Sequence, residues 1–189
     1  MRVGQSYGME ELKPLSFRLR YYPVVLVSLV TLIAVGASLP VPEPLLQEVY
    51  TQYLERVKEL RSLLINATMR EKVVYQFFFS SVGSVLASAT PVVGPFFTAY
   101  TLTSVGVGVR AVAAAESGTP LYLLLATLLD PSVWILLLAY TVAVVESAYL
   151  TQVITRRNRL WFELTFAMLA LAATLALISA TLTVVLATL

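Results

Sequence analysis

The chain has 189 residues, of which 58% are hydrophobic and 13% are charged, with a net charge of +2. Soluble domains carry about 25% charged residues, so this composition excludes an ordinary water-soluble domain, and no basic stripe points to nucleic acid. Cysteine and histidine are absent, which excludes disulfides, thiolate or imidazole catalysis and the usual zinc, haem or iron–sulfur sites. We therefore expect a membrane protein that is not an enzyme and holds no cofactor or metal.

Residues 1–20 are polar and are predicted to form a cytoplasmic N-terminal segment. The next 20 residues, 21–40, carry no charge and are long enough to cross a hydrocarbon core of about 30 Å as a helix. Tyr21 and Tyr22 stand where an aromatic belt would place them. A cleavable signal peptide is the alternative, because Val35 and Ala37 resemble a small-residue cleavage site.

Residues 41–72 are predicted to form an extramembrane amphipathic helix, separated from the first span by a proline-rich stretch. Its apolar side chains alternate at spacings of four and three residues, which is the pattern of a heptad seam. The seam residues are Leu46, Tyr50, Tyr53, Val57, Leu60 and Leu64. The helix either rests on its own membrane domain or pairs with a second copy or another protein.

The remaining segment, 73–189, is predicted to be a transmembrane helical core. Its expected spans are 73–90, 95–115, 133–151 and 160–189. An uncharged proline- and glycine-containing break at 91–95 indicates a turn close to the membrane, where the backbone needs polar partners. The apolar stretch 121–129 is too short to cross, so it is either a re-entrant half-helix or part of one kinked span. The fold class is thus an all-α, polytopic bundle of about five spans with broken or re-entrant helices.

The orientation of the bundle follows from the arginines that flank the spans, because Lys and Arg favour the cytoplasmic side. Arg18 and Arg20 lie before the first span, and Arg156, Arg157 and Arg159 lie before the last one. Five crossings place both groups in the cytoplasm. The N-terminus is then cytoplasmic, and the amphipathic helix and the C-terminus lie outside.

Three ionisable residues within the predicted core are functional candidates, because charges in lipid are costly. Glu146 is the strongest: it is either an ordinary interfacial acid or, if turned inward, a proton or cation site. Asp130 precedes Pro131, which suits a helix N-cap, but it could instead form a buried ion pair with Arg110. Arg110 alternatively snorkels to the interface.

Small residues recur every four positions along two predicted spans, which lets helix backbones approach closely. They are Gly83 and Ala87 in one span, and Ala172, Ala176 and Ala180 with Ser179, Thr183 and Ala187 in the last one. The sequence does not say whether the neighbouring helix belongs to the same chain.

The segment between residues 77 and 150 carries several short motifs: 90–95 (TPVVGP), Gly106 with Gly108, 130–134 (DPSVW), 139–143 (AYTVA) and the Glu146–Ser147 pair. Together they resemble the archaeal branch of the stage II sporulation protein M-like family. The resemblance implies about five spans and, for the sporulation member, work within a membrane complex that remodels the septal wall. Ser80, Ser81 and Leu136 stand where the family usually carries asparagine or glutamate.

These observations lead to two hypotheses about function. The first is a non-enzymatic, dimeric membrane protein that serves as a scaffold or subunit of a membrane complex, with membrane lipid and a second copy or partner protein around it. The second is a channel or transporter for an ion or small solute that uses broken helices and the carboxylates of Asp130 and Glu146.

Overall fold

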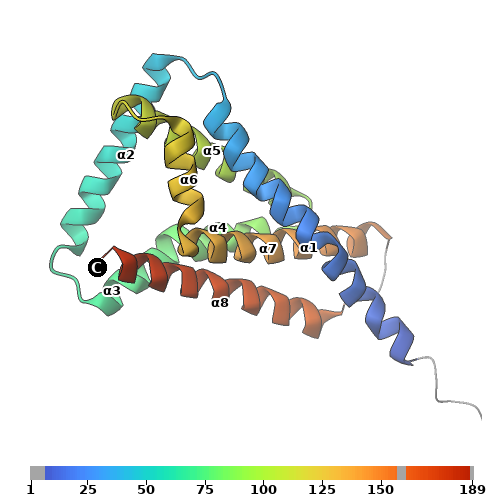
Figure 1. Ribbon diagram of the computed structural model, residues 1–189. Helices are drawn as coiled ribbons and strands as arrows, with labels where there is room; N and C mark the ends of the chain where they lie inside the picture. Colours follow the sequence, from blue (N-terminus) through green and yellow to red (C-terminus); the bar gives the residue numbers. More distant parts are fainter. Residues whose placement is uncertain (1–6, 157–160, 188–189) are drawn as a thin grey trace, which may run out of the picture.

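The structure is a computed structural model that describes residues 7–156 and 161–187, with the side chains of 7–14, 60, 63–64 and 79–80 left out. The described residues form helices and short connections, with no strand among them. The helices are α1 (Tyr7–Ser38), α2 (Glu43–Leu64), α3 (Met69–Tyr75), η1 (Gln76–Val82), α4 (Gly83–Ser88), α5 (Val93–Ala115), α6 (Pro120–Leu129), α7 (Pro131–Arg156) and α8 (Phe162–Leu186). Figure 1 shows them in chain order.

Four described helices are long and apolar enough to cross a membrane. They are Leu15–Ser38 within α1, Val93–Ala115, Pro131–Arg156 and Phe162–Leu186. This confirms the all-α class and is consistent with a multi-pass membrane protein. The first helix is continuous from Tyr7, so part of the predicted N-terminal segment extends the first span as a helix.

The expected span at 73–90 is helical, but it is built from three consecutive pieces. A π-helical segment, η1, separates α3 from α4, and each piece has seven residues or fewer. The stretch expected at 121–129 is the ten-residue helix α6, which ends at Leu129; Asp130 links it to α7, which begins at Pro131. Figure 1 shows α6 running from the end of α5 to the start of α7.

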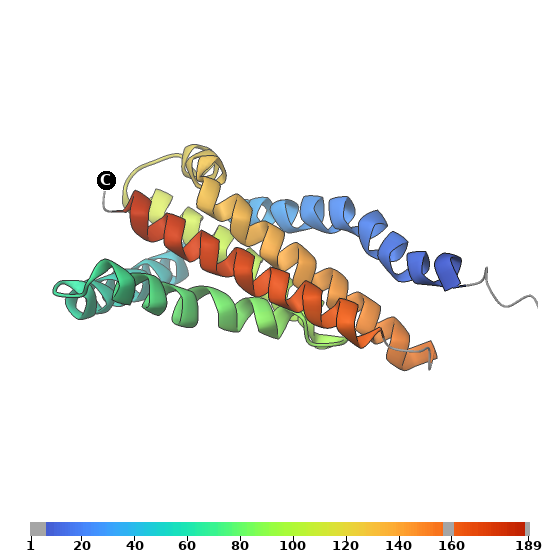
Figure 2. The ribbon, with the colours of Figure 1, turned by 90° about the horizontal axis from the view of Figure 1, so that it is seen from below.

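The bundle has two ends, which we call the Arg18 end and the far end. At the Arg18 end, α1, α7 and α8 meet at Arg18, Glu146 and Thr165, and the turn before α5 contacts α7 through Thr90. At the far end, the start of α7 bonds to the last third of α8, since Ser179 Oγ donates to the carbonyl of Ser132. In Figure 2, α3, η1 and α4 run alongside α8, and all three contact it.

Helix α7 is the centre of the bundle, since it contacts α1, α4, α5, α6 and α8. In its most apolar 18-residue window 61% of the residues are buried, against 22–28% in the other three spans. Ala172, Ala176 and Ala180 of α8 are fully buried. The predicted stripe of small residues on α8 therefore serves packing within the chain.

Helices α1 and α5 cross at two glycines. A Cβ atom added to Gly36 would lie 2.2 Å from the carbonyl oxygen of Thr103, and one added to Gly106 would lie 2.2 Å from that of Ile33. Any side chain at these positions would push the two helices apart. Gly108, two residues further along α5, faces open space.

The amphipathic helix α2 packs against α5. Leu46 of the predicted seam is buried, whereas Tyr53 is 52% exposed. Tyr50 and Val57 are half-buried, and the side chains of Leu60 and Leu64 lie outside the described residues. The beginning of α2 thus rests on its own chain, and the Tyr53 side chain is exposed.

Helix α3 begins with a capping box. Thr68 Oγ1 accepts from the Glu71 N–H, and the Glu71 carboxylate accepts from the Thr68 N–H at 2.7 Å. These backbone and side-chain bonds from Thr68 hold the pKa of Glu71 below its ordinary value. The box fixes where the chain re-enters the bundle after α2.

Candidate functional site

Glu146 lies on the most enclosed part of the protein. Every residue from Ala139 to Ser147 is buried, and Glu146 itself has 0% exposure. A carboxylate in such a place is strongly disfavoured unless a cation and hydrogen bonds compensate for the lost water. Of the two alternatives for Glu146, the structure therefore shows the inward-facing side chain and not the interfacial acid.

The compensating cation is Arg18 of α1, which is also fully buried. Its Nε donates to one carboxylate oxygen of Glu146, and its Nη2 donates to the other at 2.9 Å. The same Nη2 donates to Thr165 Oγ1 of α8 at 3.2 Å. A two-point arginine–carboxylate pair has fixed geometry, so these bonds set the positions of α1, α7 and α8 relative to one another.

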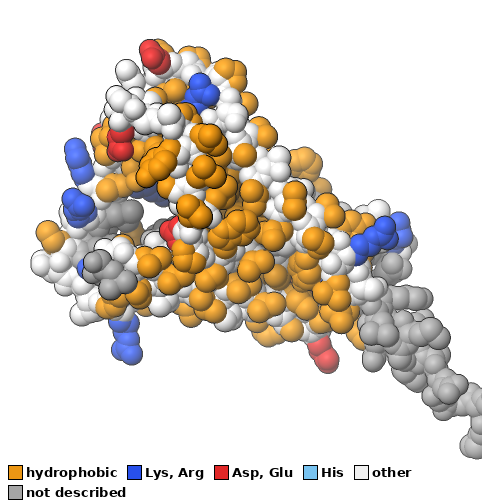
Figure 3. Space-filling model, in the orientation of Figure 1, with side chains coloured by type: hydrophobic (Ala, Val, Ile, Leu, Met, Phe, Trp, Pro, Cys, Tyr) orange, Lys and Arg blue, Asp and Glu red, His pale blue; other side chains and the backbone are white. Residues whose placement is uncertain are grey.

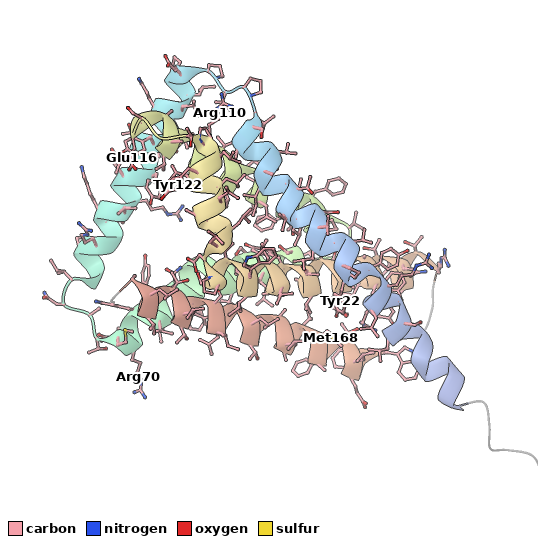
Figure 4. All side chains as sticks on the ribbon, viewed as in Figure 1. Tyr22, Arg70, Arg110, Glu116, Tyr122 and Met168 are labelled. Atoms are coloured by element: carbon pink, nitrogen blue, oxygen red, sulfur yellow. The ribbon has the colours of Figure 1, made fainter. Side chains whose placement is uncertain are left out.

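Aromatic side chains enclose the pair. The Tyr149 ring lies below the guanidinium group, with Arg18 Cζ 4.0 Å from its centroid, which is a cation–π contact. One turn further along α1, the Tyr22 hydroxyl donates to Met168 Sδ of α8 at 3.5 Å (Figure 4). Across the described chain no buried side-chain nitrogen or oxygen lacks a hydrogen-bond partner.

This arrangement suits holding helices better than chemistry at a reacting group. Both oxygens of Glu146 accept hydrogen bonds from Arg18, and the side chain has 0% exposure, so the carboxylate is not accessible from the surface of the protein. Among the described residues there is no group of three acidic, histidine or cysteine side chains that could hold a metal ion. The pair is also the one ion pair found in that part of the chain.

The residues that follow Glu146 hold the turn between α4 and α5. Ser147 Oγ donates to the carbonyl of Thr90 at 2.6 Å, and Thr151 Oγ1 accepts from the Val92 N–H at 2.8 Å. Val92 has a φ of 66° and a ψ of −51°, the strained conformation at the centre of a γ-turn in which the Val93 N–H donates to the carbonyl of Pro91 at 2.7 Å. The backbone of an uncharged break near the membrane needs hydrogen-bond partners, and polar side chains of α7 supply them here.

Asp130 and Arg110 are not brought together. Asp130 Oδ1 accepts from the Ser132 N–H at 2.8 Å, which agrees with the capping interpretation for the start of α7. Arg110 is half-exposed and lies toward the far end of α5, near Glu116 in Figure 4. The hypothesis of an Arg110–Asp130 ion pair is wrong, because α6 stands between the end of α5 and Asp130.

Sequence reasoning missed Arg18, which it placed with the solvated N-terminal segment. A signal did exist, because an acid within an apolar span needs a cation and Arg18 stands at the edge of the first apolar run. Arg157 and Arg159, also used for the orientation, lie outside the described residues.

No protein-family model, curated protein or solved structure matches this chain. The relation to the stage II sporulation protein M-like family therefore stays a prediction from the motifs.

Proposed function

We propose that the protein is a non-enzymatic structural subunit or scaffold of a membrane complex. The observation that carries this proposal is the sealed Arg18–Glu146 pair, in which both charges are fully buried and satisfied by each other. The strongest candidate site of the chain is used to hold three helices together. A scaffold needs such fixed geometry, whereas a transporter needs a charged group that its cargo can reach.

The proposed membrane topology has five passes. Helix α1 leads from the Arg18 end to the far end, yet α5 starts again at the Arg18 end, next to Ser147 and Thr151. The chain must therefore return in between. The pieces α3, η1 and α4, with 7, 7 and 6 residues, follow one another directly. Their uncharged part begins at Val73, and from there to the end of α4 it extends over roughly 24 Å at about 1.5 Å per residue, close to the thickness of the hydrocarbon core.

In this topology the Arg18 end is cytoplasmic, since the exposed Arg20 and Arg156 both lie there. Helix α2 lies outside the membrane, where Tyr53 faces away from the rest of the chain. A second copy of the chain covers Tyr53, and the protein is a homodimer along the outward part of α2. The motifs shared with the archaeal stage II sporulation protein M-like proteins support a role in a membrane complex of that kind.

Single-cysteine crosslinking tests the dimer cleanly, because the natural chain has no cysteine. In membranes under mild oxidation, Tyr53→Cys should give a disulfide-linked dimer. Glu55→Cys, which is exposed two residues away on another face of α2, is the matched control and should remain monomeric. Equal dimer yields at both positions, or none at Tyr53→Cys, would count against the seam.

A channel or transporter for an ion or small solute is the second candidate. It is favoured by an ionisable pair within spanning helices and by the π-helical segment η1, a feature that often marks functional sites. Ion flux into protein-containing liposomes that Glu146→Gln abolishes, while the fold is retained, would favour transport over the scaffold.

A further inference from the structure

A groove runs between α1 and α7 on the outer side of the Arg18–Glu146 pair. Its volume is about 310 Å³, and it is lined by Phe17, Tyr21, Val25, Val145, Ala148, Gln152 and Arg156. The residues of α1 are mostly aromatic, and the Phe17 and Tyr21 rings pack 4.6 Å apart. The groove opens at the surface of the helices that span the membrane, so lipid is what it meets first.

The lining changes character along α7. Val145, Ala148, Gln152 and Arg156 follow one another at spacings of three and four residues, so they share one face of the helix. Their order toward the Arg18 end is apolar, small, polar and cationic. From Val145 to Arg156 the helix rises about 16 Å, similar to the depth of a headgroup region with the upper part of an acyl chain.

The charge at this end favours an anion. Arg18 and Glu146 neutralise each other. The other described charged residues at this end are two exposed cations, Arg20 and Arg156, and one exposed acid, Glu163. The described chain offers Arg156 no carboxylate partner. Figure 3 shows Lys and Arg side chains gathered at the right of the molecule, where α7 ends, beside a largely hydrophobic surface.

We propose that this groove is a binding site for one anionic phospholipid. The upper acyl chain lies on Val25 and Ala148, and the phosphate is held by Arg156 and the Gln152 amide. Tyr21 contributes the aromatic contact usual at the interface. Basic pockets between spanning helices bind anionic headgroups in this way. The site goes beyond the scaffold role and depends neither on a dimer nor on the number of passes.

The test is native mass spectrometry of the full chain in detergent, with equal amounts of phosphatidylglycerol and phosphatidylcholine added. Two variants probe the two halves of the groove: Arg156→Gln removes the cation, and Ala148→Trp fills the apolar floor from an exposed position. Arg61→Gln, exposed in the last turn of α2, is the charge-matched control. Circular dichroism confirms that each variant is folded.

Wild type and Arg61→Gln should retain phosphatidylglycerol in preference to phosphatidylcholine, and Arg156→Gln should lower this retention about fivefold. Ala148→Trp should lower the retention of phosphatidylglycerol as well. Equal retention of the two lipids by wild type would overturn the proposal. Unchanged retention in either groove variant would also overturn it, because the site needs both the cation and the open floor.

Discussion

The buried pair makes a sharp prediction about three variants. Glu146→Gln and Arg18→Met each leave one buried group without its charged partner. The double variant Arg18→Met/Glu146→Gln leaves none, and its methionine fills the space of the arginine stem. If the pair holds the three helices together, each single substitution should destabilise the fold more than the double substitution does.

The size of the effect follows from complete burial, since both side chains have 0% exposure. Removing one member of such a pair costs about 3–5 kcal/mol, whereas replacing both members is often close to neutral. For a chain of this length, 1 kcal/mol corresponds to about 2–4 °C in melting temperature. Each single variant should therefore melt roughly 6–20 °C below wild type. The double variant leaves no buried charge, only a neutral amide at a cost of about 1–3 kcal/mol, so it should melt above both single variants.

The assay is thermal unfolding in detergent, followed by circular dichroism at one protein concentration. Glu163→Gln is the matched control, because Glu163 is an exposed acid in the first turn of α8 at the same end. It should melt like wild type. If the losses of the two single variants add up in the double variant, the residues do not act as a pair and the reasoning fails.

Three further predictions follow from the local geometry. Gly106→Ala should lower the melting temperature and Gly108→Ala should not, because only the first Cβ meets the Ile33 backbone; equal effects would contradict the close crossing of α1 and α5. Val92→Gly should raise stability by about 1 kcal/mol in thermal unfolding, because glycine adopts the positive-φ γ-turn conformation without the strain of a branched side chain; a loss would contradict this. The lowered pKa of Glu71 means that its contribution is present above its unfolded pKa and lost as pH falls through its folded pKa. The protection factors of the amides at the start of α3, which correct for the intrinsic pH dependence of exchange, should fall as the solution is acidified, and Glu71→Gln should remove that pH dependence.

Much of the fold could be predicted from hydrophobic length, which is a local property. The spans expected at 95–115, 133–151 and 160–189 correspond to Val93–Ala115, Pro131–Arg156 and Phe162–Leu186. The break at Asp130 was also readable, because an aspartate before a proline is a local signal for the start of a helix. No local sequence pattern predicted η1, because the hydrogen bonding of a π-helix depends on how the neighbouring helices pack.

Only one member of the Arg18–Glu146 pair could be predicted, because the sequence shows local patterns and not which distant residues pack together. The apolar surroundings of Glu146 in the sequence were enough to single it out. Its partner is 128 positions away, and only the packing of α1 against α7 joins them. The choice of Arg110 for Asp130 failed because similar depth in a bilayer does not make two residues neighbours.

The central claim is that the Glu146 carboxylate is sealed inside the bundle, and its reactivity tests this most directly. Folded wild-type protein in liposomes would be treated with a water-soluble carbodiimide and an amine, and the labelled carboxylates mapped by mass spectrometry. We predict that Glu163 is labelled and Glu146 is not. Labelling of Glu146 as fast as that of Glu163 would show that water reaches the pair, and the scaffold account would give way to transport.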